Sequence, residues 1–143
     1  MTLIVDASVA VKWLVDEADS QAAQRLLDSD EKLVAPDFVL IEVGNVLWKK
    51  AQRRQLEPEQ AVAGIEALPT YFEQLVPSAP LLPRALTIAI DVRHPVYDCL
   101  YLACAERLQM TLVTADVRFA AMIRAKFPLL RTVTHTEAGS ARD

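Results

Sequence analysis

The sequence is poor in cysteine and histidine, with two of each in 143 residues. Cys99 and Cys104 lie five positions apart, a spacing that does not place them on one face of a helix. We therefore expect neither a local disulfide nor a paired metal-ligand arrangement. His94 and His135 lie far apart in the sequence, so nothing resembles a zinc framework. Both cysteines are expected to be small core residues.

Long hydrophobic runs are also missing. The N-terminus, MTLIVDAS, has neither the basic segment nor the long apolar segment of a signal peptide. No uninterrupted apolar run reaches the roughly 18 residues of a membrane-spanning helix. The net charge of −4 argues against binding nucleic acid through the overall charge of the protein. It does not exclude local contacts with phosphate groups. We expect a soluble, cytoplasmic protein with no membrane partner.

The sequence contains enough apolar residues for one folded domain. Its hydrophobic fraction is 52%, which excludes a disordered chain, and its length fits a single domain with a sizeable core. No internal repeat, low-complexity segment or linker is present. We expect the domain to span residues 1–133 and residues 134–143, which are polar, to form a flexible tail.

Short apolar runs alternate with stretches of helical spacing. Strands are predicted at residues 3–5, 33–35, 71–76, 112–114 and 130–133. Helices are predicted at residues 7–14, 20–28, 39–53, 58–68, 81–92, 97–108 and 117–125. This alternation predicts an α/β fold with three layers, in which a central, mostly parallel sheet of four to five strands lies between helices.

Two predicted strands end at an acid. LIVDAS ends its apolar run at Asp6, and LVTADVRF places Asp116 shortly after its own run. Each acid could simply cap the following helix or stabilise a turn, as Ser8 after Asp6 also suggests. Because ligands of open parallel sheets bind beyond the carboxyl ends of the strands, the two acids could instead be neighbours at a site, if their strands are adjacent.

Two further acids stand among apolar residues. Glu42 lies in PDFVLIEVGNVLWKK, with Asn45 three positions later on the same helix side, and Asp98 lies in HPVYDCLYLACA. Each could be a capping or first-turn acid. Burial of a carboxylate without a partner is costly, so both acids require a cation, hydrogen bonds or protonation.

Four acids at strand ends and helix starts of one small sheet predict a cation site. Converging carboxylates repel one another unless a divalent cation is bound or their pKa values are raised. Oxygen ligands without histidine or cysteine favour Mg²⁺ or Mn²⁺. Such an ion suits phosphodiester hydrolysis, because it can generate the attacking hydroxide and neutralise charge on the phosphate.

The four segments LIVDAS, PDFVLIEVGNVLWK, HPVYDCLYLACA and LVTAD together resemble the PIN-domain ribonucleases, and within these the toxins of VapBC toxin–antitoxin pairs. The family's acidic quartet falls on Asp6, Glu42, Asp98 and Asp116. Polar positions beside the family's site fall on Ser8, Asn45 and Thr114. The resemblance implies a Mg²⁺-dependent endoribonuclease that acts on RNA, forms a homodimer and is inhibited by a cognate antitoxin.

Basic residues offer candidate contacts with RNA phosphates. Lys49, Lys50, Arg53 and Arg54 cluster near the end of the helix that carries Glu42, and Lys12 and Arg118 follow two of the other acids. The cluster could equally be a solvated helix end whose cations complement the helix dipole. Trp13 and Trp48 lie in apolar patterns that favour packing over contact with bases.

Three other functions compete with a ribonuclease. An aspartyl-phosphate phosphatase would require a second Asp two residues after Asp6, where this chain has Ser8. A phosphoacceptor receiver domain would require paired acids after the first strand and an Asp after the third. A catalytically inactive PIN-like module that only binds RNA or protein would not require the intact quartet.

Overall fold

The computed structural model describes residues 1–133, and its sheet has five strands. These are β1 (Thr2–Val5), β2 (Lys32–Pro36), β3 (Gln74–Val76), β4 (Thr111–Thr114) and β5 (Leu130–Thr132). All neighbours pair in parallel, in the order β3-β2-β1-β4-β5. The predicted parallel sheet is confirmed, and β1 is its central strand with β4 directly beside it.

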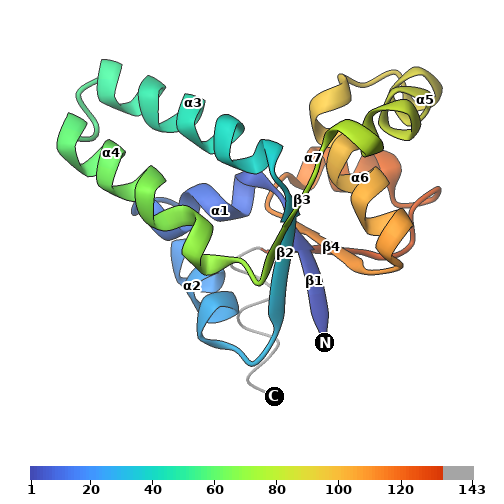
Figure 1. The fold of residues 1–143 in the computed structure, drawn as a ribbon, viewed down its shortest axis with the longest axis horizontal. Coiled ribbons are helices and arrows are strands. Elements are labelled where there is room, and N and C mark those ends of the chain that lie inside the picture. Colours follow the sequence, from blue (N-terminus) through green and yellow to red (C-terminus); the bar gives the residue numbers. More distant parts are fainter. Residues whose placement is uncertain (134–143) are drawn as a thin grey trace.

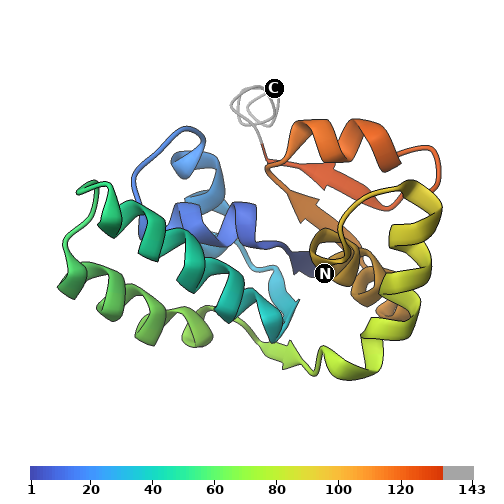
Figure 2. The ribbon, with the colours of Figure 1, turned by 90° about the horizontal axis from the view of Figure 1, so that it is seen from above.

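The helices cover both faces of this sheet. They are α1 (Ala7–Leu14), α2 (Ser20–Asp28), α3 (Phe38–Gln52), α4 (Pro58–Ala67), α5 (Leu82–Val92), α6 (Val96–Leu108) and α7 (Val117–Ile123). Helices α1 to α4 lie on one side, α5 and α6 lie on the other, and α7 packs beside the edge strand β5 (Figures 1 and 2). The predicted three-layer architecture is therefore confirmed.

The core lies between the sheet and these helices. Leu3, Ile4 and Val5 of β1 are completely buried, as expected for a central strand covered on both faces. Helix α6 packs against β1, β2, β4 and α5, which explains its apolar sequence. Cys99 and Cys104 of this helix are buried free thiols, so their predicted role as core residues is confirmed.

One predicted element is wrong in its first half. Residues 71–76 were expected to form a strand, but a 3₁₀ helix, η1 (Leu68–Tyr71), occupies its start, and β3 begins only at Gln74. The ring of Trp13 on α1 packs against Tyr71 and Phe72, with centroids 5.9 and 5.6 Å apart. This aromatic packing holds Tyr71 and Phe72 against α1, and pairing with β2 begins only at Glu73, whose N–H donates to the Leu33 carbonyl (2.8 Å).

Smaller differences concern element ends. Helix α7 ends at Ile123, two residues earlier than expected, and β2 continues through Pro36. A second short 3₁₀ helix, η2 (Ala79–Leu81), precedes α5. No helix within residues 1–133 is both long and apolar enough to cross a membrane. The predicted flexible tail, residues 134–143, lies outside the described residues.

Candidate active site

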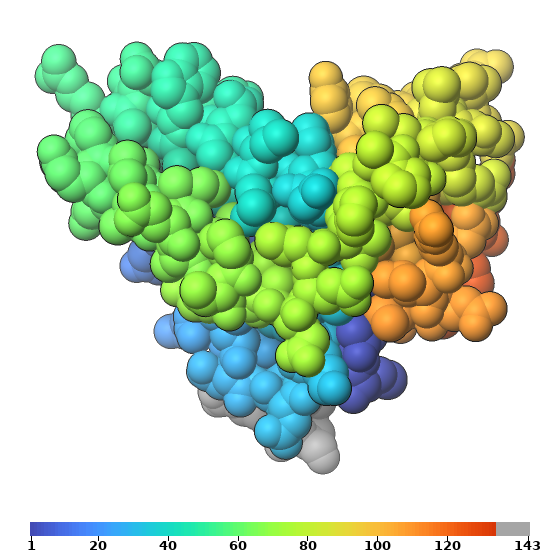
Figure 3. Space-filling view, in the orientation of Figure 1, coloured from blue at the N-terminus to red at the C-terminus, as the bar shows by residue number. Residues whose placement is uncertain are grey.

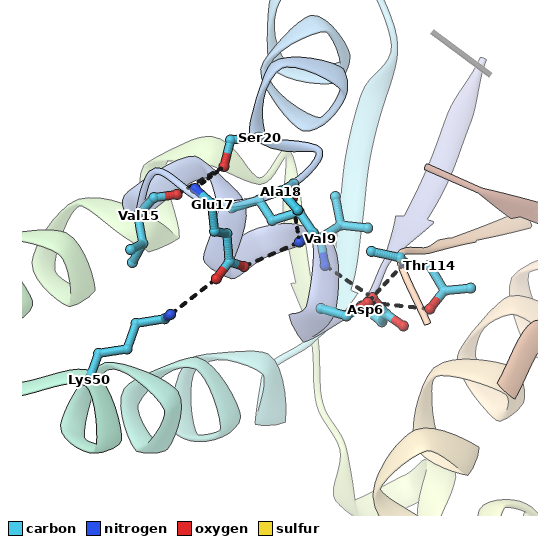
Figure 4. A network of polar contacts seen from close by, with 11 residues as sticks. Asp6, Val9, Val15, Glu17, Ala18, Ser20, Lys50 and Thr114 are labelled. Carbon is cyan, nitrogen blue, oxygen red and sulfur yellow. Dashed lines mark hydrogen bonds and ion pairs between the residues drawn. The ribbon is translucent and has the colours of Figure 1, made fainter. Parts of the chain in front are cut away.

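Asp6 follows β1 directly and is 5% exposed. Its Oδ1 atom accepts hydrogen bonds from the Ser8 hydroxyl (2.5 Å) and from the backbone N–H of Val9 (3.3 Å), so Asp6 caps α1. Figure 4 shows Asp6 beside Val9 and Thr114. Burial raises the pKa of Asp6 to about 6, although these hydrogen bonds act in the opposite direction.

Hydroxyl groups connect Asp6 to Asp116. The Ser8 hydroxyl lies 3.3 Å from the Thr114 hydroxyl and accepts a hydrogen bond from the N–H of Ala115 (2.9 Å). The Thr114 hydroxyl in turn accepts the N–H of Asp116 (3.1 Å). This connection exists because β1 and β4 are adjacent, as the predicted neighbourhood of the two acids required.

Asp116 is exposed and caps α7, since its Oδ1 accepts the N–H of Phe119 at 3.0 Å. Both strand-end acids are therefore helix caps, and the hydroxyls of Ser8 and Thr114 link one to the other. The two sequence interpretations do not exclude each other. A cap uses part of a carboxylate's capacity to accept hydrogen bonds and leaves the rest available.

Glu42 on α3 and Asp98 in the first turn of α6 complete the acidic cluster. Burial, together with the smaller effects of the Asp98 and Asp6 charges, raises the pKa of Glu42 to about 7. The Oε1 atom of Glu42 is buried and has no hydrogen-bond partner among the described residues. Carboxylates from α3, α6 and the end of β1 therefore act on one another electrostatically, and this repulsion favours protonation or a bound cation.

Tyr101 and His94 also interact with the acidic cluster, although the sequence did not identify them as site residues. Burial raises the pKa of the Tyr101 phenol, and the charges of Glu42, Asp6 and Asp98 add to the effect. The Nε2 atom of His94 lies 2.6 Å from Oδ2 of Asp98. Its ring packs against Phe119 of α7, with centroids 4.8 Å apart. The available signal was spacing: Tyr101 follows Asp98 by three residues and His94 precedes it by four.

Asn45 and Asp116 are less closely connected to the acidic cluster than the other predicted site residues. Asn45 is exposed on α3. Within residues 1–133 no three or more His, Cys, Asp or Glu side chains stand close enough together to form a complete metal site. Asp6, Glu42 and Asp98 are coupled through their charges, whereas Asp116 is joined to Asp6 through Ser8 and Thr114.

Two of the predicted phosphate contacts are already engaged. The Glu17 carboxylate lies 3.0 Å from the Lys50 ammonium (Figure 4) and 3.2 Å from the Lys12 ammonium. Lys12 also donates to the carbonyl of Ala18. Burial acts to raise the pKa of Glu17, but the hydrogen bonds from both lysines hold it below its usual value. Lys49, Arg53 and Arg118 are exposed.

Comparisons with known proteins agree with this architecture. The PIN domain family model matches residues 3–124. Ribonuclease VapC3 from Pyrobaculum aerophilum is 37% identical over 134 residues, covering 92% of this chain and 99% of the relative. The crystal structure of PAE2754 from Pyrobaculum aerophilum superposes with a TM-score of 0.72 at 25% identity, covering 93% of this chain and 84% of that one. A toxin–antitoxin complex from Klebsiella pneumoniae shares the fold, with a TM-score of 0.60 at 16% identity, covering 90% and 94%.

Proposed function

The chain belongs to the PIN-domain family as a homologue of the VapC ribonucleases, and on that premise we propose that it is the endoribonuclease toxin of a toxin–antitoxin pair. The observation that carries the proposal is the coupled cluster of Asp6, Glu42 and Asp98 at the carboxyl end of β1. The reaction is the hydrolysis of RNA phosphodiester bonds in the cytoplasm. The family match leaves no support for the phosphatase and receiver alternatives.

A hard divalent cation, Mg²⁺ or alternatively Mn²⁺, fits the residues of this site. The donor set consists of oxygen atoms, and the Oε1 atom of Glu42 is buried without a partner in the described part of the chain. We assign the ion to the acidic quartet Asp6, Glu42, Asp98 and Asp116. When bound, the ion supplies a hydroxide nucleophile at neutral pH and compensates negative charge on the phosphate.

The neighbouring side chains orient the acids. Ser8 holds one oxygen of Asp6, and Thr114 fixes the backbone at Asp116. The hydrogen bond from His94 engages one oxygen of Asp98 and leaves the other available as a ligand. For the phosphate backbone of RNA we favour the exposed cations Lys49, Arg53 and Arg118, because Lys12 and Lys50 would first have to leave Glu17.

The role of His94 gives a specific prediction. His94→Ala should weaken Mn²⁺ binding and RNA cleavage by about 10-fold or more, as removal of a residue that orients a ligand usually does. His94→Gln should retain most of both, because the glutamine amide can donate from nearly the position of the imidazole Nε2. Titration calorimetry with Mn²⁺ separates this effect from activity. Equal affinity in the wild type and His94→Ala would contradict the assignment.

The proposed partners are an RNA substrate, a cognate antitoxin and a second copy of the chain. The relatives named ribonuclease and the toxin–antitoxin complex of the same fold support the first two. An antitoxin segment that carries Arg could compete with the metal, because a guanidinium can engage a carboxylate through two parallel hydrogen bonds. The acidic cluster is the surface that such a residue would reach.

The proposal is tested by incubating the purified chain with total RNA in Mg²⁺ and mapping the new RNA ends. We expect discrete cleavage that is abolished by EDTA and restored by Mg²⁺ or Mn²⁺, and poorly by Zn²⁺. Induced expression should stop growth, and co-expression of a cognate antitoxin should restore it. An intact RNA pool together with tight RNA binding would instead identify an inactive PIN-like binding module.

A further inference from the structure

Two aromatic rings stack where α3 and α6 begin. Phe38 is the first residue of α3 and Tyr97 lies in the first turn of α6. Their ring centroids are 5.7 Å apart and their planes differ by 9°. Phe38 is half-buried, whereas Tyr97 remains 57% exposed. The pair therefore forms a flat aromatic surface that is backed by Phe38 and open to solvent at Tyr97.

This aromatic surface lies next to the acidic cluster. Phe38 precedes Glu42 by one helical turn, so the two residues share a face of α3. Tyr97 directly precedes Asp98 on α6. The same two helices thus contribute one aromatic and one acidic residue each, and Figure 3 shows the start of α3 and the segment leading into α6 side by side on the molecular surface.

Both rings are attached to well-anchored backbone. The N–H of Phe38 donates to the Ser78 hydroxyl (3.1 Å), which in turn donates to the Asp37 carboxylate (2.6 Å). The N–H of Asp37 donates to the carbonyl of Val76 at the end of β3 (2.8 Å). Tyr97 follows Pro95, whose ring limits the backbone at the start of α6. A surface held in this way loses little conformational freedom when a ligand stacks on it.

We propose that Tyr97, supported by Phe38, is a stacking platform for one unpaired base of the RNA substrate. The inference rests on the proposed function and deepens it. A base in a duplex has both faces covered by its neighbours, so only a nucleotide in a single strand, loop or bulge can stack on the ring. The platform stands beside Glu42 and Asp98, so it would position the phosphate next to that base for hydrolysis and select against duplex RNA.

The chain offers a matched control in Trp48. This residue is 56% exposed and lies on the same helix as Phe38, but ten positions further along, which corresponds to about 15 Å. Trp48 and Tyr97 are therefore about equally exposed, but only Tyr97 lies close to Glu42 and Asp98. If exposure alone produced RNA binding, Trp48 and Tyr97 would contribute equally.

The test measures binding of a short single-stranded RNA to the Asp6→Asn protein, which keeps the RNA intact. An abasic nucleotide is moved along the RNA one position at a time. We expect one position at which base removal weakens binding to the Asp6→Asn protein about 10-fold. At that position the loss should disappear in the Tyr97→Leu variant and persist in the Tyr97→Phe and Trp48→Leu variants.

The outcomes are distinguishable. If the Asp6→Asn protein does not bind RNA, the proposed function itself fails. If it binds RNA but no abasic position is linked to Tyr97, the function stands and the platform is wrong. If Tyr97→Leu alters only the oligomeric state, the aromatic surface belongs to an interface between two copies. Because the abasic scan of the Asp6→Asn protein leaves Tyr97 unchanged, the absence of any sensitive position overturns the platform even if Tyr97→Leu fails to fold.

Discussion

Replacing Asp98 by Asn is expected to reduce RNA cleavage by about 1,000-fold or more without unfolding the protein. A bound metal ion stabilises the charge of the transition state by several kcal/mol, and each 1.4 kcal/mol corresponds to about a factor of ten. Asn keeps the size of Asp98 and an oxygen that can accept the hydrogen bond from His94, but it removes the negative charge. Asp6→Asn should have the same effect.

The stability of the metal-free variant separates a catalytic role from a structural one. The charge of Asp98 raises the pKa values of both Glu42 and Asp6, so its removal relieves repulsion in the cluster. We therefore expect the thermal midpoint of Asp98→Asn without metal to hold or to rise.

A matched control for this substitution is Asp91→Asn. This acid lies on α5, exposed and paired with Lys126, and is not part of the cluster. It should retain wild-type cleavage. An Asp98→Asn protein that still cleaves RNA, or that is inactive only because it does not fold, would disprove the assigned role.

The sequence predicted the framework of this site because its signals are local. Apolar runs that end in an acid identify strand ends, and the order of strands and helices predicts a parallel sheet. The link from Asp6 to Asp116 through Ser8 and Thr114 then required only that β1 and β4 be adjacent, as they are. The alternative interpretation of both acids as helix caps is also correct, since each accepts a backbone N–H of the following helix.

The rest depends on contacts between helices that are distant in sequence. The charge coupling of Glu42 with Asp98 and the stacking of Phe38 on Tyr97 both require that α3 and α6 meet at one end of the sheet. The ion pairs of Glu17 with Lys12 and Lys50 depend on how α1, α3 and the loop after α1 pack. No periodicity within a single segment encodes such pairings.

The last prediction concerns the stability of the metal-free protein between pH 4 and pH 8. Burial raises the pKa of Asp6 from 3.8 to about 6 and that of Glu42 from 4.5 to about 7. In this pH range the unfolded chain loses its protons first, while the folded protein still holds them. Stability is therefore greatest at low pH and is lost as the pH rises from about 4 to about 7.

The size of the expected loss of stability follows from the change in the pKa of Asp6 on folding. A change from 3.8 to about 6, at about 1.4 kcal/mol for each tenfold change in proton affinity, corresponds to about 3 kcal/mol. Glu42 is coupled to Asp6, so its contribution does not simply add. For a chain of this size, 3 kcal/mol corresponds to roughly 6–12 °C in the midpoint of thermal unfolding. The pKa values of Glu17, Asp91 and Glu106 are lowered, so their ion pairs have the opposite sign: they stabilise the folded protein above about pH 4.5 and lose this contribution only as the pH falls below it.

Thermal unfolding in EDTA across this pH range measures the effect, and two comparisons connect it to the acidic cluster. Glu42→Gln should flatten the profile, because it removes one of the two carboxyls whose pKa values are raised in the folded protein. Mg²⁺ should raise the midpoint more at pH 8 than at pH 5, because a cation binds carboxylates only after their protons have left. If the metal-free protein were as stable at pH 8 as at pH 5, the folded protein would not raise the pKa values of Asp6 and Glu42, and the electrostatic basis of the proposed site would be lost.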